Sequence, residues 1–350
     1  MLENKIITNK TCGKLYIAGE YSILTAGQSA IIKNVNIFME SRISFSDTDE
    51  YTVFSDMFDY KLTLEKDTFN NENILQNFDK NYLLICEAIS VMSEYLKLKN
   101  LEIKPFEMKI TGKMERDGKK FGIGSSGSVV ILTIKSILSL YNFEISKEML
   151  FKLSSYVLLK RGDNGSMGDI ACISYENMVF YTSFDREKIK EFIEKKDLKE
   201  VLEMDWGYRI EEIKCGIECD FLVGWTKKPS ISSEMIKIVK SSIDKKFLSE
   251  VQVIVNNLRE AIINGEKEKI KKLNYYKDVK VKSSENEDII TMLNSEKISV
   301  RAGHHCAMPL HRYIDEVSTL RLSFGMYTTK EEIDYTISKI IEIGEIKWLN

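Results

Sequence analysis

The stretch KKFGIGSSGS, residues 119–128, gathers three glycines, three serines and two lysines in ten positions. Glycines let backbone N–H groups approach an anion closely, and serine hydroxyls add further donors. The apolar run VVILTIKSILSLY (129–141) follows at once and predicts a buried helix that begins near Ser126. Because the N-terminus of a helix carries partial positive charge, the stretch predicts a phosphate-binding loop. The alternative is a glycine-rich helix entry that binds no ligand.

The three glycines also satisfy G-x-G-x-x-G, the pattern of dinucleotide-binding folds. That fold places a strand directly before the first glycine and an acidic residue about 20 positions further on. Here the charged segment TGKMERDGKK (111–120) precedes the glycines and predicts a loop, which disfavours a dinucleotide. The Walker pattern G-x-x-x-x-G-K-[ST] is absent. Lys119 and Lys120 stand where cations could neutralise the oxygens of a transferring phosphoryl group.

The composition is that of an ordinary globular chain. Its 350 residues, 43% hydrophobic and 29% charged, are enough for two domains with buried cores. A net charge of −3 gives no general attraction to nucleic acid or to an anionic membrane. No apolar run approaches the roughly 18 residues of a spanning helix, and we see no secretory signal. Six scattered cysteines do not suggest a disulfide framework. We therefore expect a cytoplasmic protein.

Hydrophobic periodicity predicts an irregular succession of strands and helices. Strands are expected across much of residues 1–65 and at 106–110, 170–174, 178–184 and 220–225. Helices are expected at 79–100, 129–141, 144–160, 186–204, 231–241 and 246–264. This order indicates an α+β fold rather than a regular β-α-β succession.

Three separated motifs resemble those of one enzyme family. GKLYIAGEYSIL (13–24), KKFGIGSSGS and KRGDNGSMGDIA (160–171) are similar to the first two motifs and the acidic segment of GHMP-family kinases. DWGY (205–208) and CDFLVGWTKKPSISSEM (219–235) resemble the bacterial phosphomevalonate kinases in particular. The resemblance runs from about residue 7 to about 272. It implies an ATP-binding domain like domain 2 of ribosomal protein S5 over 1–205, and the start of a ferredoxin-like domain over 206–276.

The resemblance also implies an activity and its ligands. The chain would use ATP and Mg²⁺ to phosphorylate (R)-5-phosphomevalonate in the mevalonate pathway of isoprenoid synthesis. The residues expected to bind ATP are Lys119, Gly122, Gly124, Ser125, Ser126, Gly127 and Ser128. Ser126, or else Ser125, is the expected Mg²⁺ ligand. No nucleic-acid or membrane partner is expected, and the oligomeric state is left open.

The catalytic roles follow from charge, because phosphoryl transfer depends on positioning and on neutralising negative charge. The cations expected there are Lys14 and Lys120 at the γ-phosphate, and Lys160 and Arg161 at the acceptor phosphate. The family carries an acidic residue near the acceptor, which makes Asp169 the first candidate and Asp163 the second. For either aspartate, the alternative is a turn or cap residue beside neighbouring glycines.

The C-terminal part of the chain has a different character. KDVKVKSSENED (277–288) contains two apolar residues in twelve and predicts a linker, so we place a junction at 277–286. Within 287–350, the runs VRAGHHCAMP (300–309) and STLRLSFGMYTTK (318–330) resemble the end of SUF-type cysteine desulfurases, which are pyridoxal-phosphate enzymes. The third glycine-rich motif of GHMP kinases, S-G-A-G-G-G-D, is absent. We therefore expect an impaired kinase.

The tail carries the residues of a second chemistry. In desulfurases the cysteine that matches Cys306 accepts sulfur as a persulfide, and the arginine that matches Arg321 holds the substrate carboxylate. Nothing in residues 1–280 resembles the lobe that grips pyridoxal phosphate, so the tail is expected to be inactive. A zinc site is disfavoured because H-H-C-x4-H is not a structural zinc spacing. Sulfur transfer through Cys306, and nucleotide binding without turnover, are the alternatives to kinase activity.

Overall fold

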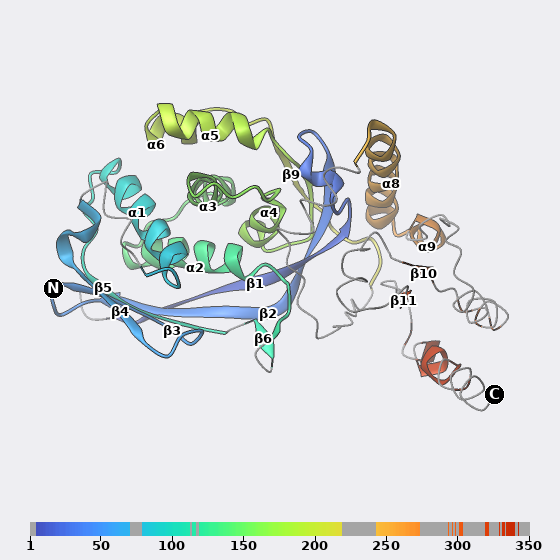
Figure 1. Cartoon of the computed structure of the whole chain (residues 1–350), viewed down its shortest axis with the longest axis horizontal. Coiled ribbons are helices and arrows are strands. Elements are labelled where there is room, and N and C mark those ends of the chain that lie inside the picture. Colours follow the sequence, from blue (N-terminus) through green and yellow to red (C-terminus); the bar gives the residue numbers. More distant parts are fainter. Residues whose placement is uncertain are drawn as a thin grey trace. The chain divides into compact units, whose positions relative to one another are not determined.

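The computed structural model describes residues 5–70, 79–112, 114–116, 119–218 and 243–273, with short stretches between 293 and 342. The chain divides into two compact units (Figure 1). The first holds the described residues up to Ile213 and Asp244–Val255, and the second holds 214–218, Ile243 and the described residues from Asn256 onward. Each unit is described by itself.

A seven-stranded sheet forms the base of the first unit. Its strands are β1 (Ile7–Ala18), β2 (Ser29–Phe45), β3 (Glu50–Ser55), β4 (Lys61–Glu65), β5 (Phe106–Thr111), β8 (Val179–Thr182) and β9 (Arg209–Glu212). The order is β4-β3-β5-β2-β8-β9, with β1 paired to β2. The pair β3–β5 is parallel, and the other pairs are antiparallel. The predicted strands of the first 65 residues, 106–110 and 178–184 are thereby confirmed.

Helices lie on one side of this sheet, some of them packed on other helices and not on the strands (Figure 1). They are α1 (Leu83–Lys97), α2 (Ser125–Leu140), α3 (Lys147–Lys160), α4 (Gly168–Tyr175), α5 (Arg186–Lys195) and α6 (Leu198–Glu203), with short 3-10 helices at Ser22–Leu24 and Lys66–Asn70. Most residues of α2 are buried, since it packs against the sheet on one side and against α1, α3 and α4 on the others. The predicted helices at 79–100, 129–141, 144–160 and 186–204 are confirmed, the last as α5 and α6.

Two local predictions were wrong. Residues 170–174, IACIS, form part of α4 instead of a strand. A five-residue apolar run fits a buried strand and a buried helix equally well, so periodicity alone does not separate them. The charged segment before the glycines is not a plain loop, because β6 (Glu115–Arg116) pairs antiparallel with β7 (Lys119–Lys120). Backbone groups make the hydrogen bonds of such a hairpin, so charged side chains do not prevent it.

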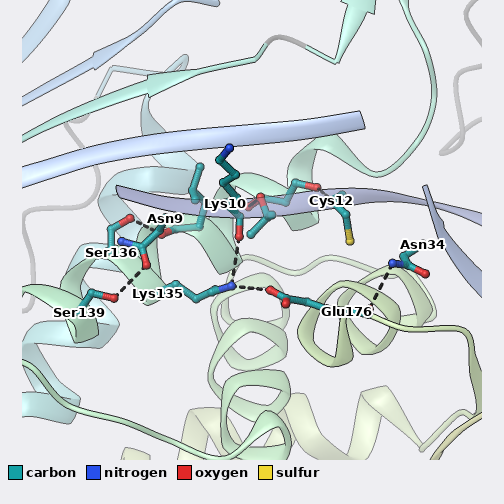
Figure 2. Close-up of polar contacts among 11 residues, drawn as sticks. Asn9, Lys10, Cys12, Asn34, Lys135, Ser136, Ser139 and Glu176 are labelled. Atoms are coloured by element: carbon teal, nitrogen blue, oxygen red, sulfur yellow. Dashed lines mark hydrogen bonds and ion pairs between the residues drawn. The ribbon is translucent and has the colours of Figure 1, made fainter. Parts of the chain in front are cut away.

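Polar contacts fix the C-terminal end of α4 against β1 and α2 (Figure 2). Lys135 of α2 donates from Nζ to the carbonyl of Lys10 in β1, at 3.1 Å, and pairs with Glu176, the residue that ends α4. Asn34 of β2 donates to the Glu176 carbonyl at 3.2 Å. These contacts hold α4 in place, and its other end carries Asp169.

The described part of the second unit contains α9 (Lys267–Leu273), β10 (Arg301–Gly303) and β11 (Thr319–Arg321). The helix α8 (Lys245–Asn264), whose residues up to Val255 belong to the first unit, confirms the prediction for 246–264. β10 and β11 pair antiparallel, with Arg301 opposite Arg321. Tyr335 donates from its hydroxyl to Glu296 at 2.7 Å. The strand expected at 220–225, the helix expected at 231–241, and Cys306 lie outside the described residues.

Within the described residues, no helix is both long enough and apolar enough to cross a membrane.

Candidate active site

The glycine loop leads from β7 into the N-terminus of α2. Gly122 and Gly124 have φ of +75° and +87°, where glycine is favoured over residues with a Cβ. The helix begins at Ser125, next to the predicted Ser126, and its first turn contains no acidic residue. The first backbone N–H groups of a helix have no partner within it. Since Ser125 is part-exposed and Ser126 exposed, this helix end can receive an anion.

Ser128 lies one turn deeper and contacts β1. It is fully buried, and its hydroxyl donates to the carbonyl of Cys12 at 3.0 Å. Thr11 in turn donates from its hydroxyl to the Ser128 carbonyl at 3.3 Å. These bonds tie α2 to β1. Of the three loop serines predicted to bind ATP, the structure therefore places Ser125 and Ser126 at the accessible end, and Ser128 against the strand.

Lys14 of β1 reaches the same loop. Its backbone N–H donates to the carbonyl of Ile123 at 2.8 Å. A Cβ placed on Gly124 would lie 3.0 Å from Cε of Lys14 and 3.5 Å from Cβ of Asp169. Both side chains thus reach one point beside Gly124. The structure therefore brings together Lys14, Asp169 and the glycine loop, which belong to three separate sequence motifs.

Asp169 stands in the first turn of α4 and faces the start of α2. Its Oδ1 accepts the N–H of Ile170 at 2.9 Å, and its Oδ2 lies 3.0 Å from where a Cβ on Gly127 would be. Burial raises the pKa of Asp169, while the positive charge of Lys14 opposes this rise and the negative charge of Asp163 adds to it. The carboxyl group is therefore held in a partly dehydrated place beside a cation.

The candidates for the acceptor phosphate lie at the end of α3. Lys160, Arg161 and Asp163 are all exposed. Asp163 accepts the N–H of Gly165 at 2.5 Å, a turn contact of the kind that formed the alternative interpretation of this residue. Burial raises the pKa of the Glu87 carboxyl in α1, and the positive charges of Lys160 and Arg161 lower it.

Two groups of predicted residues are only partly described. The backbone of Lys119 and Lys120 forms β7, but their side chains are outside the described part of the chain. The backbone of Arg321 lies in β11 opposite that of Arg301 in β10, and its side chain is likewise outside the described part of the chain.

Sequence reasoning missed Tyr16 and Ser166. Nζ of Lys14 lies 5.0 Å from the centre of the Tyr16 ring, and the Tyr16 hydroxyl lies 2.9 Å from Oγ of Ser166. One signal was available, because Lys14 and Tyr16 are two positions apart in a strand and so share a face. The contact with Ser166 spans 150 positions and had no local signal.

The residues present fit a magnesium ion shared with a polyphosphate. Among the described residues, no group of three or more His, Cys, Asp or Glu side chains could hold a metal ion. Mg²⁺ does not need one, since it usually takes one or two protein oxygens together with waters and phosphate oxygens. Ser126 is exposed in the first turn of α2, and Oδ2 of Asp169 faces that turn at Gly127. A hydroxyl and a carboxylate are suitable hard ligands.

Comparisons with known proteins match the two parts of the chain to two families. The family model described as GHMP kinases N terminal domain matches residues 83–177. The model described as Aminotransferase class-V matches residues 237–336, and so begins upstream of the predicted junction.

Solved structures match nearly the whole chain. A Streptococcus pneumoniae phosphomevalonate kinase, solved in complex with phosphomevalonate and AMPPNP, is 38% identical, with a TM-score of 0.75 and 97% of each chain covered. A Lin0012 protein from Listeria innocua has a TM-score of 0.72, with 97% of this chain and 96% of that chain covered. At 22% identity, the second likeness shows the fold alone. The predicted α+β kinase fold is confirmed.

Curated relatives match smaller parts of the chain than the solved structures do. A phosphomevalonate kinase from Streptomyces sp. (strain CL190) is 22% identical over 246 residues, and the chain spans 64% of its length. A probable cysteine desulfurase from Halalkalibacterium halodurans is 53% identical over 47 residues, which is 13% of this chain and 12% of that protein. The resemblance of the tail to desulfurases is therefore confirmed, over a short segment.

Proposed function

This chain belongs to the GHMP kinases, and from that premise we propose that it transfers the γ-phosphoryl group of ATP to the phosphate of phosphomevalonate. The products would be ADP and 5-diphosphomevalonate, within the mevalonate pathway. The similar Streptococcus pneumoniae kinase, which binds phosphomevalonate and AMPPNP, supports this choice of substrates. In the same proposal, residues 1–205 form the ATP-binding domain, 206–276 begin the C-terminal domain, and the desulfurase-like segment 287–350 follows a junction at 277–286.

The observation that carries the proposal is the meeting of Lys14 and Asp169 at Gly124. Transfer between two phosphates crowds negative charge at the reacting phosphorus, so catalysis needs fixed positive charge and alignment. The α2 N-terminus and the loop N–H groups would hold the ATP phosphates. Lys14 would then neutralise the γ-phosphoryl oxygens, with Lys120 as a second cation from the β6–β7 hairpin.

The reaction needs no strong base. An oxygen of the acceptor phosphate, already anionic near neutral pH, attacks the γ-phosphorus, and the bond from that phosphorus to the bridging β-γ oxygen breaks to release ADP. Asp169 would hold the Lys14 ammonium in place by its charge, since the two side chains meet at one point. Ser126 and Asp169 would hold Mg²⁺, which would supply positive charge to neutralise the phosphate oxygens during transfer.

The acceptor phosphate would be held by exposed cations at the end of α3. Lys160 and Arg161 are the candidates, and Asp163 lies close enough for its charge to raise the pKa of Asp169. An arginine suits this task because its planar fork binds two phosphate oxygens at once.

The desulfurase-like tail would change the rate of the kinase reaction but not its chemistry. The third glycine-rich motif of the family is missing, so we propose reduced turnover. Sulfur transfer through Cys306 is not proposed, because the chain spans only 12% of the matched desulfurase. The cytoplasmic location belongs to the proposal as well; the cysteines of the described residues, Cys12, Cys86, Cys172 and Cys215, are free thiols, as suits a reducing compartment.

The test is ADP release from the full chain with ATP, Mg²⁺ and phosphomevalonate. We expect release that depends on phosphomevalonate and falls about 100-fold or more in Lys14→Met and Lys120→Ala. Lys97→Ala, a change at the exposed end of α1, serves as the control with unchanged activity. No release above the ATP-only rate would count against the proposal, and saturable nucleotide binding without turnover would favour the binding-only alternative.

A further inference from the structure

We propose that Tyr16 is a positioning residue that sets the geometry between Lys14 and Asp169. The inference deepens the proposed kinase function and rests on it. Its basis is that one side chain contacts both halves of the site, the lysine through its ring and the turn before the aspartate through its hydroxyl.

The ring of Tyr16 supports the Lys14 ammonium. The two residues stand at i and i+2 of β1, so their side chains leave the same face of the strand. Nζ of Lys14 lies 5.0 Å from the ring centre, within the range of a cation–π interaction. A lysine has four flexible side-chain bonds, and a ring below its ammonium restricts where the charge can lie. Tyr16 therefore limits the positions open to the charge that would meet the γ-phosphate.

The hydroxyl of Tyr16 holds the turn that leads into α4. It lies 2.9 Å from Oγ of Ser166, and that Oγ accepts the N–H of Gly168 at 3.3 Å. The carbonyl of Ser166 accepts the hydroxyl of Tyr181 at 2.8 Å. Between Ser166 and Gly168, Met167 adopts φ of +63°, an uncommon conformation for a residue with a side chain. The hydrogen bonds on either side of Met167 hold the backbone in this conformation.

The backbone of this turn packs closely against Tyr16 at Gly168. A Cβ on Gly168 would lie 2.5 Å from the Tyr16 hydroxyl oxygen and 2.7 Å from Cδ1 of Ile32. Asp169 is the next residue along the chain, and its carboxyl experiences the charge of Lys14. A change in the position of the Tyr16 hydroxyl would therefore shift the backbone next to Asp169. A change in the position of its ring would remove the contact that restrains the Lys14 ammonium group.

Two substitutions separate these contacts. Tyr16→Phe keeps the ring and removes the hydroxyl, so it should lower kcat about tenfold and leave KM for ATP within twofold. Tyr16→Leu also removes the ring, so it should lower kcat further and raise KM for ATP about fivefold. If Tyr16 affected stability alone, both variants would contain less folded enzyme. The kcat of the folded molecules would not fall in Tyr16→Phe, and KM for ATP would not rise in Tyr16→Leu.

The matched control is Tyr51→Phe. Tyr51 is a buried tyrosine of β3 whose hydroxyl donates to the carbonyl of Ile103 at 3.2 Å, so this variant loses a comparable hydrogen bond outside the site. We expect a similar fall in thermal midpoint for Tyr51→Phe and Tyr16→Phe, but unchanged kcat per folded molecule only for the former. Kinetic constants should be taken at a temperature where circular dichroism shows each variant folded.

The outcomes are distinguishable. A wild-type chain without phosphomevalonate-dependent turnover overturns the proposed function, and this inference with it. An active wild type in which Tyr16→Phe and Tyr16→Leu keep its kcat and KM, or in which both merely match Tyr51→Phe, overturns the inference alone.

Discussion

Gly124 packs directly against the side chain of Lys14, since a Cβ on this glycine would lie 3.0 Å from Cε of the lysine. Gly124→Ala should therefore displace Lys14 and lower kcat about 100-fold, because small misplacements in a phosphoryl-transfer site are costly. The positive φ of +87° adds a loss of about 1 kcal/mol in the free energy of unfolding. Steady-state kinetics and urea unfolding measure the two effects.

Gly122→Ala is the matched comparison. Gly122 has a similar φ of +75°, but a Cβ there would meet nothing within 4 Å. We expect a comparable loss of stability and a clearly smaller loss of kcat. Equal kinetic losses in the two variants would show that backbone strain, and not contact with Lys14, explains the effect at Gly124.

Asp169→Asn should separate activity from stability. Burial raises the pKa of Asp169 above its ordinary value of 3.8, so the charged form is disfavoured in the folded state. The folded protein then binds more protons than the unfolded chain between the two pKa values, and stability falls as pH rises through that window. Asparagine cannot ionise, so the variant should be more stable than wild type at neutral pH, and this gain should shrink as pH falls toward 4.

The same variant should lose kcat by about 100-fold, since it no longer offers a charge to Lys14. Thermal unfolding between pH 4 and 8 checks the stability. Asp197→Asn is the control, because asparagine caps a helix as well as aspartate and Asp197 caps α6. A gain for Asp169→Asn that stayed constant over this pH range would contradict the role assigned to ionisation.

Lys152 gives a prediction about stability alone. This buried lysine of α3 donates from Nζ to the carbonyls of Leu202 and Met204, both at 2.9 Å, at the end of α6. Lys152→Met leaves two carbonyls without that donor, so we expect a loss of about 1–3 kcal/mol in urea unfolding. Lys196→Met removes only a solvent-exposed pair with Glu200 and should cost about 0.5 kcal/mol or less. Equal losses would contradict the structural role of Lys152.

The sequence predicted the elements of the site better than their contacts. The start of α2 could be located because glycines give way to an apolar run, and Lys14 and Asp169 were predicted as site residues from motif resemblance and charge. Their meeting at Gly124 depends on how β1, α2 and α4 pack, which no local pattern encodes. The same holds for α4 itself, where the apolar run from Ile170 was mistaken for a strand because burial on all sides removes the helical periodicity.

Tyr16 shows the same limit. A tyrosine in an alternating strand can be a core residue or a residue of the site. The positioning role of Tyr16 is inferred from its contact with Ser166, 150 positions away, which the sequence does not predict. By contrast, the desulfurase-like tail was found from sequence alone, because R-A-G-H-H-C-A-x-P is specific without any knowledge of packing.

Replacing the tail should raise activity. A chain in which residues 277–350 give way to a GHMP-kinase end with a glycine-rich third motif should show kcat raised about tenfold, because that motif adds anion-binding N–H groups. The control carries the same end with the glycines of the motif changed to alanine, and it should gain much less. ADP release measures all three proteins, and an equal kcat for the chain with its own tail and the chain with the replaced tail would contradict the view that the desulfurase-like tail limits turnover.

The most direct measurement of the central claim follows the γ-phosphoryl group itself. The full chain is incubated with ATP labelled at the γ-phosphorus, Mg²⁺ and phosphomevalonate, and the products are separated. We predict that label leaves ATP and appears in diphosphomevalonate in equal amounts, and that Lys14→Met prevents the transfer. Label that stays in ATP, or that appears only as inorganic phosphate, would contradict the assignment of this site to phosphoryl transfer between two phosphates.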